Sequence, residues 1–158
     1  MKSGCYTLRE AIINKINSEN KKLSEGDRKV GTAVWSPADR QDFPSVIVLQ
    51  EDAESDYHET GERSRQRTFV YRVYIMEEIT QNRPQTQIEK DLSRGCDFLI
   101  NTFDKEDVFS NDEKKEYGIE DMIWIEPVPS IWGTVDWEGG KARVATITLR
   151  CLVMVDED

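Results

Sequence analysis

The sequence predicts an α+β protein with a mostly antiparallel β-sheet of long strands, flanked by two main α-helices. Apolar residues recur at helical spacing in residues 7–20 and 84–103. Residues 67–79 and 142–155 are instead rich in the β-branched and aromatic residues typical of strands. Because the elements follow in the order helix, strands, helix, strands, we expect one domain, residues 1–158, in which the helices lie on the sheet.

The first predicted helix begins with the sequence TLRE at residues 7–10. This matches a capping box, in which the Thr7 hydroxyl accepts a hydrogen bond from the backbone N–H of Glu10 and the Glu10 carboxylate accepts one in return. The predicted apolar face of this helix comprises Leu8, Ala11, Ile12 and Ile16. After a charged loop, a short strand fits at Thr32–Trp35, and a second strand fits the run SVIVLQED at residues 45–52.

Residues 52–66 form a polar insert with Gly61 near its middle, which predicts a long loop or the exposed tip of a hairpin. The strand that follows, residues 67–79, carries apolar residues on both faces. We therefore expect this strand to be central in the sheet or covered on both sides.

The clearest amphipathic helix is predicted at residues 84–103, where Pro84 suits the first turn. Its apolar positions are Ile88, Leu92, Cys96, Leu99 and Phe103. Residues 104–121 then form a charged connector in which a short third helix fits.

The last part of the chain predicts two further strands. Pro127 and Pro129 interrupt the first, residues 122–137, so this strand must lie at an edge of the sheet or contain a bulge. Gly139-Gly140 suits a tight hairpin turn. The closing strand, residues 142–155, would span roughly 46 Å at ~3.3 Å per residue, whereas a compact domain of this size has a diameter of about 40 Å. Either bulges bend the long strands or a neighbouring subunit covers them, and the second option is a hypothesis of homo-oligomerisation.

The chain carries 21 basic and 31 acidic residues among 158, which gives a net charge of -10. Proteins that grip nucleic acid neutralise its phosphates with Lys and Arg, so this charge argues against such a function. The three cysteines, Cys5, Cys96 and Cys151, are far apart and odd in number, which predicts reduced thiols and neither a zinc site nor a disulfide framework. The sequence shows no secretion signal and no apolar run near the ~20 residues that span a bilayer, so we expect a soluble intracellular protein without a membrane segment.

Few residues suggest chemistry. The single histidine, His58, lies with Glu54 and Asp56 in the polar insert, where an exposed acidic loop is favoured over a metal site. The sequence EGGKA at residues 138–142 lacks the spacing of a phosphate-binding loop. Glu120, Asp121 and Glu126 with Lys141 could suggest a nuclease-like cluster. Carboxylates are abundant in this chain, so chance proximity is enough to explain the group. We therefore predict a protein that is not an enzyme, without catalytic residues, cofactor or bound metal.

The tryptophans leave two interpretations open. Large aromatic side chains pack in hydrophobic cores, and they also anchor protein–protein interfaces. The residues concerned are Trp35, Trp124, Trp132 and Trp137.

The order of elements and several short sequence segments resemble those of a known family. After the capped N-terminal helix, the phrases are FPSVIVLQED, RTFVYRVYIMEE, QIEKDLSRGCDFLINTF, WIEPVPSIWGTVDW and GGKARVATITLRCLV. From about Thr7 to Val155, the chain resembles the tail-terminator proteins of long-tailed bacteriophages, also called tail-completion or head–tail joining proteins. The insert 52–66 and the connector 104–121 match this pattern least.

The resemblance implies a structural virion protein of the phage neck that assembles in the host cytoplasm. Its partners would be further copies of itself in a homo-oligomeric ring, expected to be a hexamer, the tail tube protein and the head connector or head-completion protein. The ring would cap the tail tube, end its polymerisation and join the tail to the head. DNA would pass through the lumen without specific binding, which suits a strongly negative protein.

Exposed loops often carry docking function, so we expect contacts with the tube or the connector in the insert and near the turn at residues 139–140. The predicted contact residues are Glu54, Asp56, Tyr57, His58, Arg63, Arg65, Trp132 and Trp137. Three alternative functions remain open: another neck component such as a head-closure or connector protein, a small metal-dependent phage nuclease, and a monomeric accessory protein that contacts the host.

Overall fold

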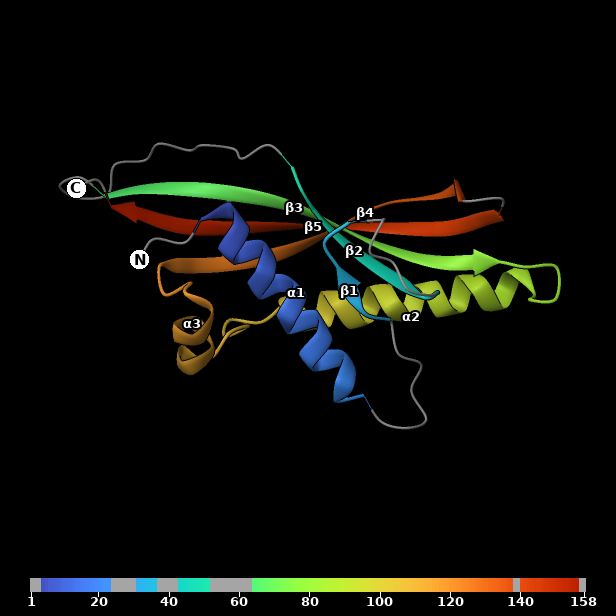
Figure 1. Ribbon diagram of the computed structural model, residues 1–158, viewed down its shortest axis with the longest axis horizontal. Coiled ribbons are helices and arrows are strands. Elements are labelled where there is room, and N and C mark those ends of the chain that lie inside the picture. The colour runs from blue at the N-terminus through green and yellow to red at the C-terminus, as the bar shows by residue number, and fades with distance from the viewer. Residues whose placement is uncertain (1–3, 24–30, 37–42, 52–63, 138–139, 157–158) are drawn as a thin grey trace.

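The structure, a computed structural model, describes residues 4–23, 31–36, 43–51, 64–137 and 140–156. In chain order, the elements are α1 (Cys5–Lys21), β1 (Ala33–Val34), β2 (Ser45–Gln50), β3 (Ser64–Ile79), α2 (Gln85–Phe103), α3 (Asn111–Tyr117), β4 (Met122–Trp137) and β5 (Gly140–Asp156). The strands form one sheet in the order β1-β2-β3-β5-β4 (Figure 1). Strands β1 and β2 are parallel and every other neighbouring pair is antiparallel, so the predicted α+β fold with a mostly antiparallel sheet is confirmed.

Helices α1 and α2 pack on the same face of the sheet and share one hydrophobic core with it (Figure 1). Removing each large apolar side chain from water stabilises the fold by roughly 1.5–3 kcal/mol. The apolar positions that the sequence predicts for the two helices are all buried: Leu8, Ala11, Ile12, Ile16, Ile88, Leu92, Cys96, Leu99 and Phe103.

The predicted capping box of the first helix is wrong. Helix α1 has Gly4 as its N-cap and makes no side-chain cap hydrogen bond, so Thr7 already lies inside the first turn. The backbone N–H of Leu8 donates to the Gly4 carbonyl oxygen at 3.1 Å. In addition, the hydroxyl of Tyr71 donates to the carbonyl oxygen of Cys5 at 2.7 Å. The helix thus begins two residues before the predicted start, and a tertiary hydrogen bond joins its first turn to β3.

The boundaries of helices α2 and α3 coincide with residues that commonly begin or end a helix. Pro84 is the N-cap of α2, just outside the helix that the sequence predicts from this residue. The short third helix, α3, lies inside the predicted connector and has a capping box between Ser110 and Glu113. Gly118 ends it in the left-handed conformation, with φ at +70°.

Strand β5 is paired on both sides within one chain. Strand β3 pairs with it from Ser64, opposite Asp156, to Ile79, opposite Lys141. Strand β4 occupies its other edge. The two long predicted strands are therefore confirmed, and the length of β5 by itself needs no neighbouring subunit.

Strand β4 lies at the edge of the sheet and contains two register shifts, next to Met122 and after Pro129. This confirms the expectation that its prolines require an edge or a bulge. The predicted Gly139-Gly140 turn needs correction, because Gly140 already pairs with Trp137 as the first residue of β5. Gly139 itself lies outside the described residues.

A smaller apolar cluster lies on the face of the sheet away from α1 and α2. Successive side chains of a strand point to opposite faces, so a central strand such as β3 can serve two clusters. This arrangement agrees with the apolar residues that the sequence places on both faces of β3. The second cluster consists of Ile47, Met76, Ala142 and Val144, with Val34, Phe43, Leu49 and Tyr74 packed against it.

Candidate functional site

The polar insert predicted at residues 52–66 ends earlier than expected, because β3 begins at Ser64. Arg65 belongs to this strand and lies opposite Val155. The other predicted contact residues of the insert fall outside the described residues, so their role stays a prediction: Glu54, Asp56, Tyr57, His58 and Arg63.

Trp132 is half-buried on β4 and packs against the main hydrophobic core. It lies opposite Ala145, and the guanidinium carbon of Arg143 is 5.9 Å from the centre of its ring. These contacts support the core interpretation for this tryptophan. Trp137, the other predicted contact residue in this region, is the last residue of β4 and pairs with Gly140.

Trp124 of β4 is 38% exposed, whereas Trp132 of the same strand is half-buried. Val128 lies on the same face of the strand and is 42% exposed, while Ile123, at the neighbouring bulge, is 44% exposed. We call Ile123, Trp124 and Val128 the edge patch. Large apolar side chains gathered on an outer strand are typical of a protein contact surface. The sequence does carry a signal for them, because alternation places Trp124, Glu126 and Val128 on one face of the strand.

A network of charged side chains holds the start of α2 to the sheet. Arg83 donates to Glu77 of β3 at 2.9 Å and also to Asp91 of α2. Both carboxylate residues are almost completely buried, at 2% and 6% exposed. Nearby, Arg143 of β5 donates to Glu89 at 2.8 Å. These contacts fix α2 relative to β3 and β5, so the network has a structural role.

A second cluster joins the start of α1 to the β1–β2 side of the sheet. The guanidinium of Arg9 lies 4.6 Å from the ring centre of Trp35 and donates to the carbonyl oxygens of Val48, at 2.8 Å, and of Trp35 itself. Tyr6 stacks on Trp35 with the ring centres 4.9 Å apart. Trp35 therefore contacts Tyr6 and Arg9 of its own chain, and these contacts support the core interpretation for this tryptophan as well.

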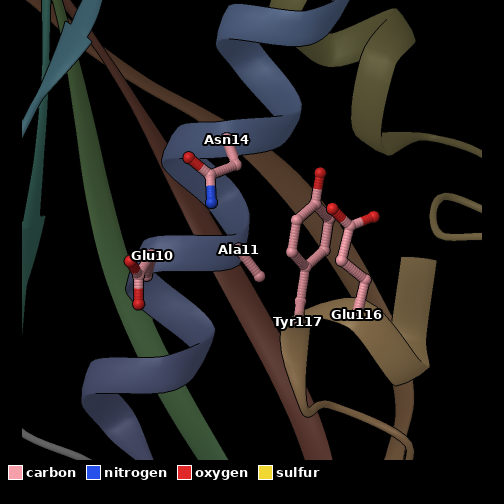
Figure 2. A pocket seen from close by; sticks show the side chains of 5 residues that line it. All are labelled: Glu10, Ala11, Asn14, Glu116 and Tyr117. Carbon is pink, nitrogen blue, oxygen red and sulfur yellow. The ribbon is translucent and has the colours of Figure 1, made fainter.

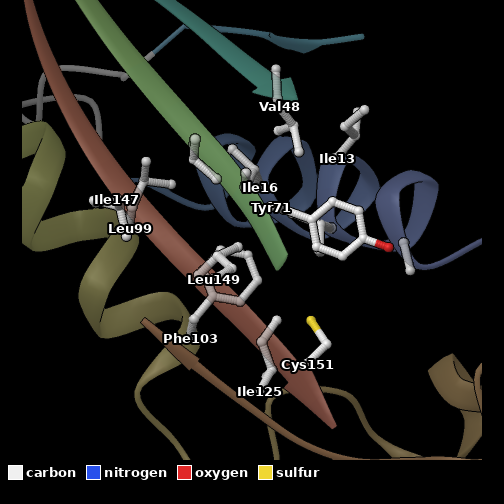
Figure 3. Close-up of a cluster of buried hydrophobic side chains, with 14 of the residues drawn as sticks. Ile13, Ile16, Val48, Tyr71, Leu99, Phe103, Ile125, Ile147, Leu149 and Cys151 are labelled. Carbon is white, nitrogen blue, oxygen red and sulfur yellow. The ribbon is translucent and has the colours of Figure 1, made fainter. Parts of the chain in front are cut away.

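The thiols lie in surroundings that keep them protonated. Burial raises the pKa of Cys151, and burial together with the nearby carboxylate of Asp97 raises the pKa of Cys96 to about 11. Figure 3 shows Cys151 and Tyr71 within the main cluster of buried side chains. All three cysteines are free, as predicted, although Cys5 is only half-buried. A protonated thiol is a poor nucleophile and a poor metal ligand, so these residues contribute packing.

A pocket of ≈ 250 Å³ lies between α1 and α3, lined by Glu10, Ala11, Asn14, Glu116 and Tyr117 (Figure 2). Figure 2 shows Tyr117 and Glu116 side by side, with the carboxylate of Glu10 turned away from them. Burial and the carboxylates of Glu113 and Glu116 raise the pKa of Tyr117. Because Glu10 points away from Glu116, the two carboxylates that line the pocket do not converge on one point. Among the residues that the structure describes, no group of three or more His, Cys, Asp or Glu side chains is placed to hold a metal ion.

The strand register separates the residues of the possible nuclease-like cluster. Glu126 lies opposite Arg150, whereas Lys141 lies opposite Asp136, ten residues further along β4. At ~3.3 Å per residue, these two positions are roughly 33 Å apart. The lysine therefore does not join the acids at the start of β4.

In comparisons with known proteins, no family model and no curated protein matches the chain. The resemblance to tail terminators thus rests on the order of elements and on the quoted phrases. Across the described ranges, no helix combines the length and the apolar character needed to cross a membrane.

Proposed function

We propose that this chain is a structural subunit of the neck of a long-tailed bacteriophage. Six copies form a ring that caps the tail tube, ends its polymerisation and joins the tail to the head connector. The subunit assembles in the host cytoplasm and resides in the virion. It acts through its contacts, without catalysis and without a cofactor.

The edge patch is the observation that carries this proposal. Ile123, Trp124 and Val128 are 44%, 38% and 42% exposed and lie on the outermost strand of the sheet. Aromatic and apolar side chains that are exposed together most often anchor a protein partner. A subunit that assembles with other subunits needs such a surface.

The shape of the subunit supports the same function. Strands β3, β4 and β5 run along the length of the molecule, and α1 and α2 cover one face of the sheet (Figure 1). The subunit therefore presents both a long sheet edge and a sheet face that these two helices leave open. Separate surfaces of this kind allow one contact with a ring neighbour and another with the tube.

The charge supports passage of DNA through such a ring. With a net charge of -10, the protein repels phosphates on average. A lumen of this character lets DNA slide without being held, because tight binding would need clustered Lys and Arg.

Electron microscopy of tail tubes incubated with the purified protein tests the proposed function. We expect a ring at one end of each tube, and no further growth when tube protein is added. Binding to filled heads and not to tubes would identify a head-closure or connector protein instead. Cleavage of DNA in the presence of a divalent metal would contradict the proposal in favour of a nuclease.

A further inference from the structure

The outermost strand, β4, has β5 as its strand neighbour within the described residues, and its other edge has no strand partner among them (Figure 1). The exposed apolar side chains of this strand are those of the edge patch and of Val135, which is 39% exposed. A long apolar strand at the edge of a sheet is a template on which strands of other copies can pair. A subunit that assembles in a fixed number of copies therefore needs a feature that limits such pairing.

The hydrogen bonds of β5 show which backbone groups of β4 lie at this edge. Successive residues of a strand direct their N–H and C=O groups to opposite sides. The Met154 N–H donates to the Asp121 carbonyl oxygen at 3.0 Å, so the even-numbered residues of β5 face β4. Two of these even-numbered residues lie opposite Glu126 and Val128. The backbone groups of Glu126 and Val128 are therefore directed toward β5.

Pro127 and Pro129 occupy the alternate positions of β4, opposite odd-numbered residues of β5, so both are directed toward the open edge. A proline has no N–H, and neither residue can donate a hydrogen bond to a strand that approaches this edge. The register also shifts between Pro129 and Trp132, and a bulge of this kind interrupts regular pairing. The two prolines and the bulge thus divide the edge into two short segments, residues 122–126 and 132–137.

We propose that Pro127 and Pro129 close the β4 edge to strand addition and so prevent separate copies of the chain from joining their sheets along this strand. This inference goes beyond the proposed function, because it holds for a ring of six copies and for any other assembly. A strand of another copy would need donors along the whole edge, and the prolines remove them at its centre. Contacts made by exposed side chains such as Trp124 do not use these donors and are unaffected.

Replacing both prolines with threonine tests this role. The variant Pro127→Thr/Pro129→Thr gains two N–H groups at the edge, and threonine favours strands without adding a large apolar side chain. We expect its mass in light scattering to exceed that of the wild type at least about twofold at the same concentration. Pro84→Thr is the matched control, because it makes the same chemical change at the N-cap of α2 and should keep the wild-type mass.

Hydrogen exchange followed residue by residue examines the edge directly. In the wild type, the amides of Glu126 and Val128 should exchange slowly, because they are directed toward β5, and the outward amide of Ile125 should exchange faster. In the associated double variant, the amide of Ile125 and the two amides gained at positions 127 and 129 should all become protected, since a second strand would accept their hydrogen bonds.

The controls separate strand addition from a loss of stability. Circular dichroism and urea denaturation establish that each variant is folded. Arg83→Ala weakens the attachment of α2 without altering the β4 edge, so association as strong as that of the double variant would overturn the proposal. A folded double variant with the wild-type mass would overturn it as well. If the double variant does not fold, Pro127→Thr and Pro129→Thr are measured singly. Each frees one N–H and should raise the mass, and the wild-type mass in both would contradict the proposal.

Discussion

Tyr71 lies where β3 passes the first turn of α1, and its hydroxyl donates to the carbonyl oxygen of Cys5 at 2.7 Å. Alternation in the sequence places Tyr71 correctly on the apolar face of a strand, and the residue is completely buried. The hydrogen bond itself has no local signal, because its two partners are 66 residues apart. The capping box predicted at Thr7 is wrong for a local reason, because α1 already begins at Cys5 with Gly4 as its N-cap.

Alkaline pH should destabilise the protein. Burial raises the pKa of Cys151 and Tyr71, and the pKa of Cys96 rises to about 11. Thiols of the unfolded chain ionise near pH ~8.5, so the folded state retains protons that the unfolded state releases. The contribution of the thiols to the free energy of unfolding is therefore complete below pH ~8.5 and is lost as the pH rises through the folded pKa values.

Urea titrations at neutral pH and near pH ~10 measure this effect. We expect a lower free energy of unfolding at the higher pH, and a smaller decrease in the variant Cys151→Ala, which lacks one of the buried thiols. An equal decrease in the variant and the wild type would show that Cys151 does not contribute.

At the scale of elements, the sequence is most informative where apolar residues recur over several turns. The predicted helix 84–103 is observed as Gln85–Phe103, because steps of three and four residues identify its buried face directly. Strand ends carry a weaker signal. The start of β3 at Ser64 and the place of Gly140 depend on which residues pair across the sheet, and pairing is a property of two distant segments.

Arg83 should be important for attaching α2 to the sheet. It contacts the carboxylates of Glu77 and Asp91, whose side chains are only 3% and 5% exposed. Removing a cation from buried carboxylates is costly, so Arg83→Ala should lower the free energy of unfolding by about 3 kcal/mol. Arg94→Ala is the matched control, because Arg94 is 70% exposed and 3.9 Å from Asp91. Chemical denaturation should show a change of only about 0–0.5 kcal/mol for the control. Equal losses in the two variants would contradict this role.

The polar insert should serve docking and not ring formation. In a variant with residues 54–63 replaced by a short Gly–Ser linker, β3 can still begin at Ser64, so we expect the ring to form with the wild-type number of copies. Tails capped by this variant should fail to join heads in an assembly assay, because exposed loops carry docking contacts. Joining at the wild-type level would remove the insert from the docking surface.

At the scale of the whole molecule, the register of the strands decides which edges of the sheet are left for a neighbour. The excess length of the strands predicts a neighbouring subunit, yet β5 is paired on both sides within its own chain. Within the described residues, the exposed apolar edge is instead the start of β4, which carries the edge patch. The sequence contains Ile123, Trp124 and Val128, but only the folded sheet places them together on its outermost strand. Alternation in the sequence thus predicts the shared face of Trp124 and Val128, whereas their place at the edge of the sheet depends on strand pairing and could not be predicted.

The mass of the purified wild-type protein in solution tests the ring most directly. Light scattering over a range of concentrations should give six times the mass of the 18.3 kDa chain, and electron micrographs of the same sample should show closed rings. A mass of 18.3 kDa at every concentration would contradict the account.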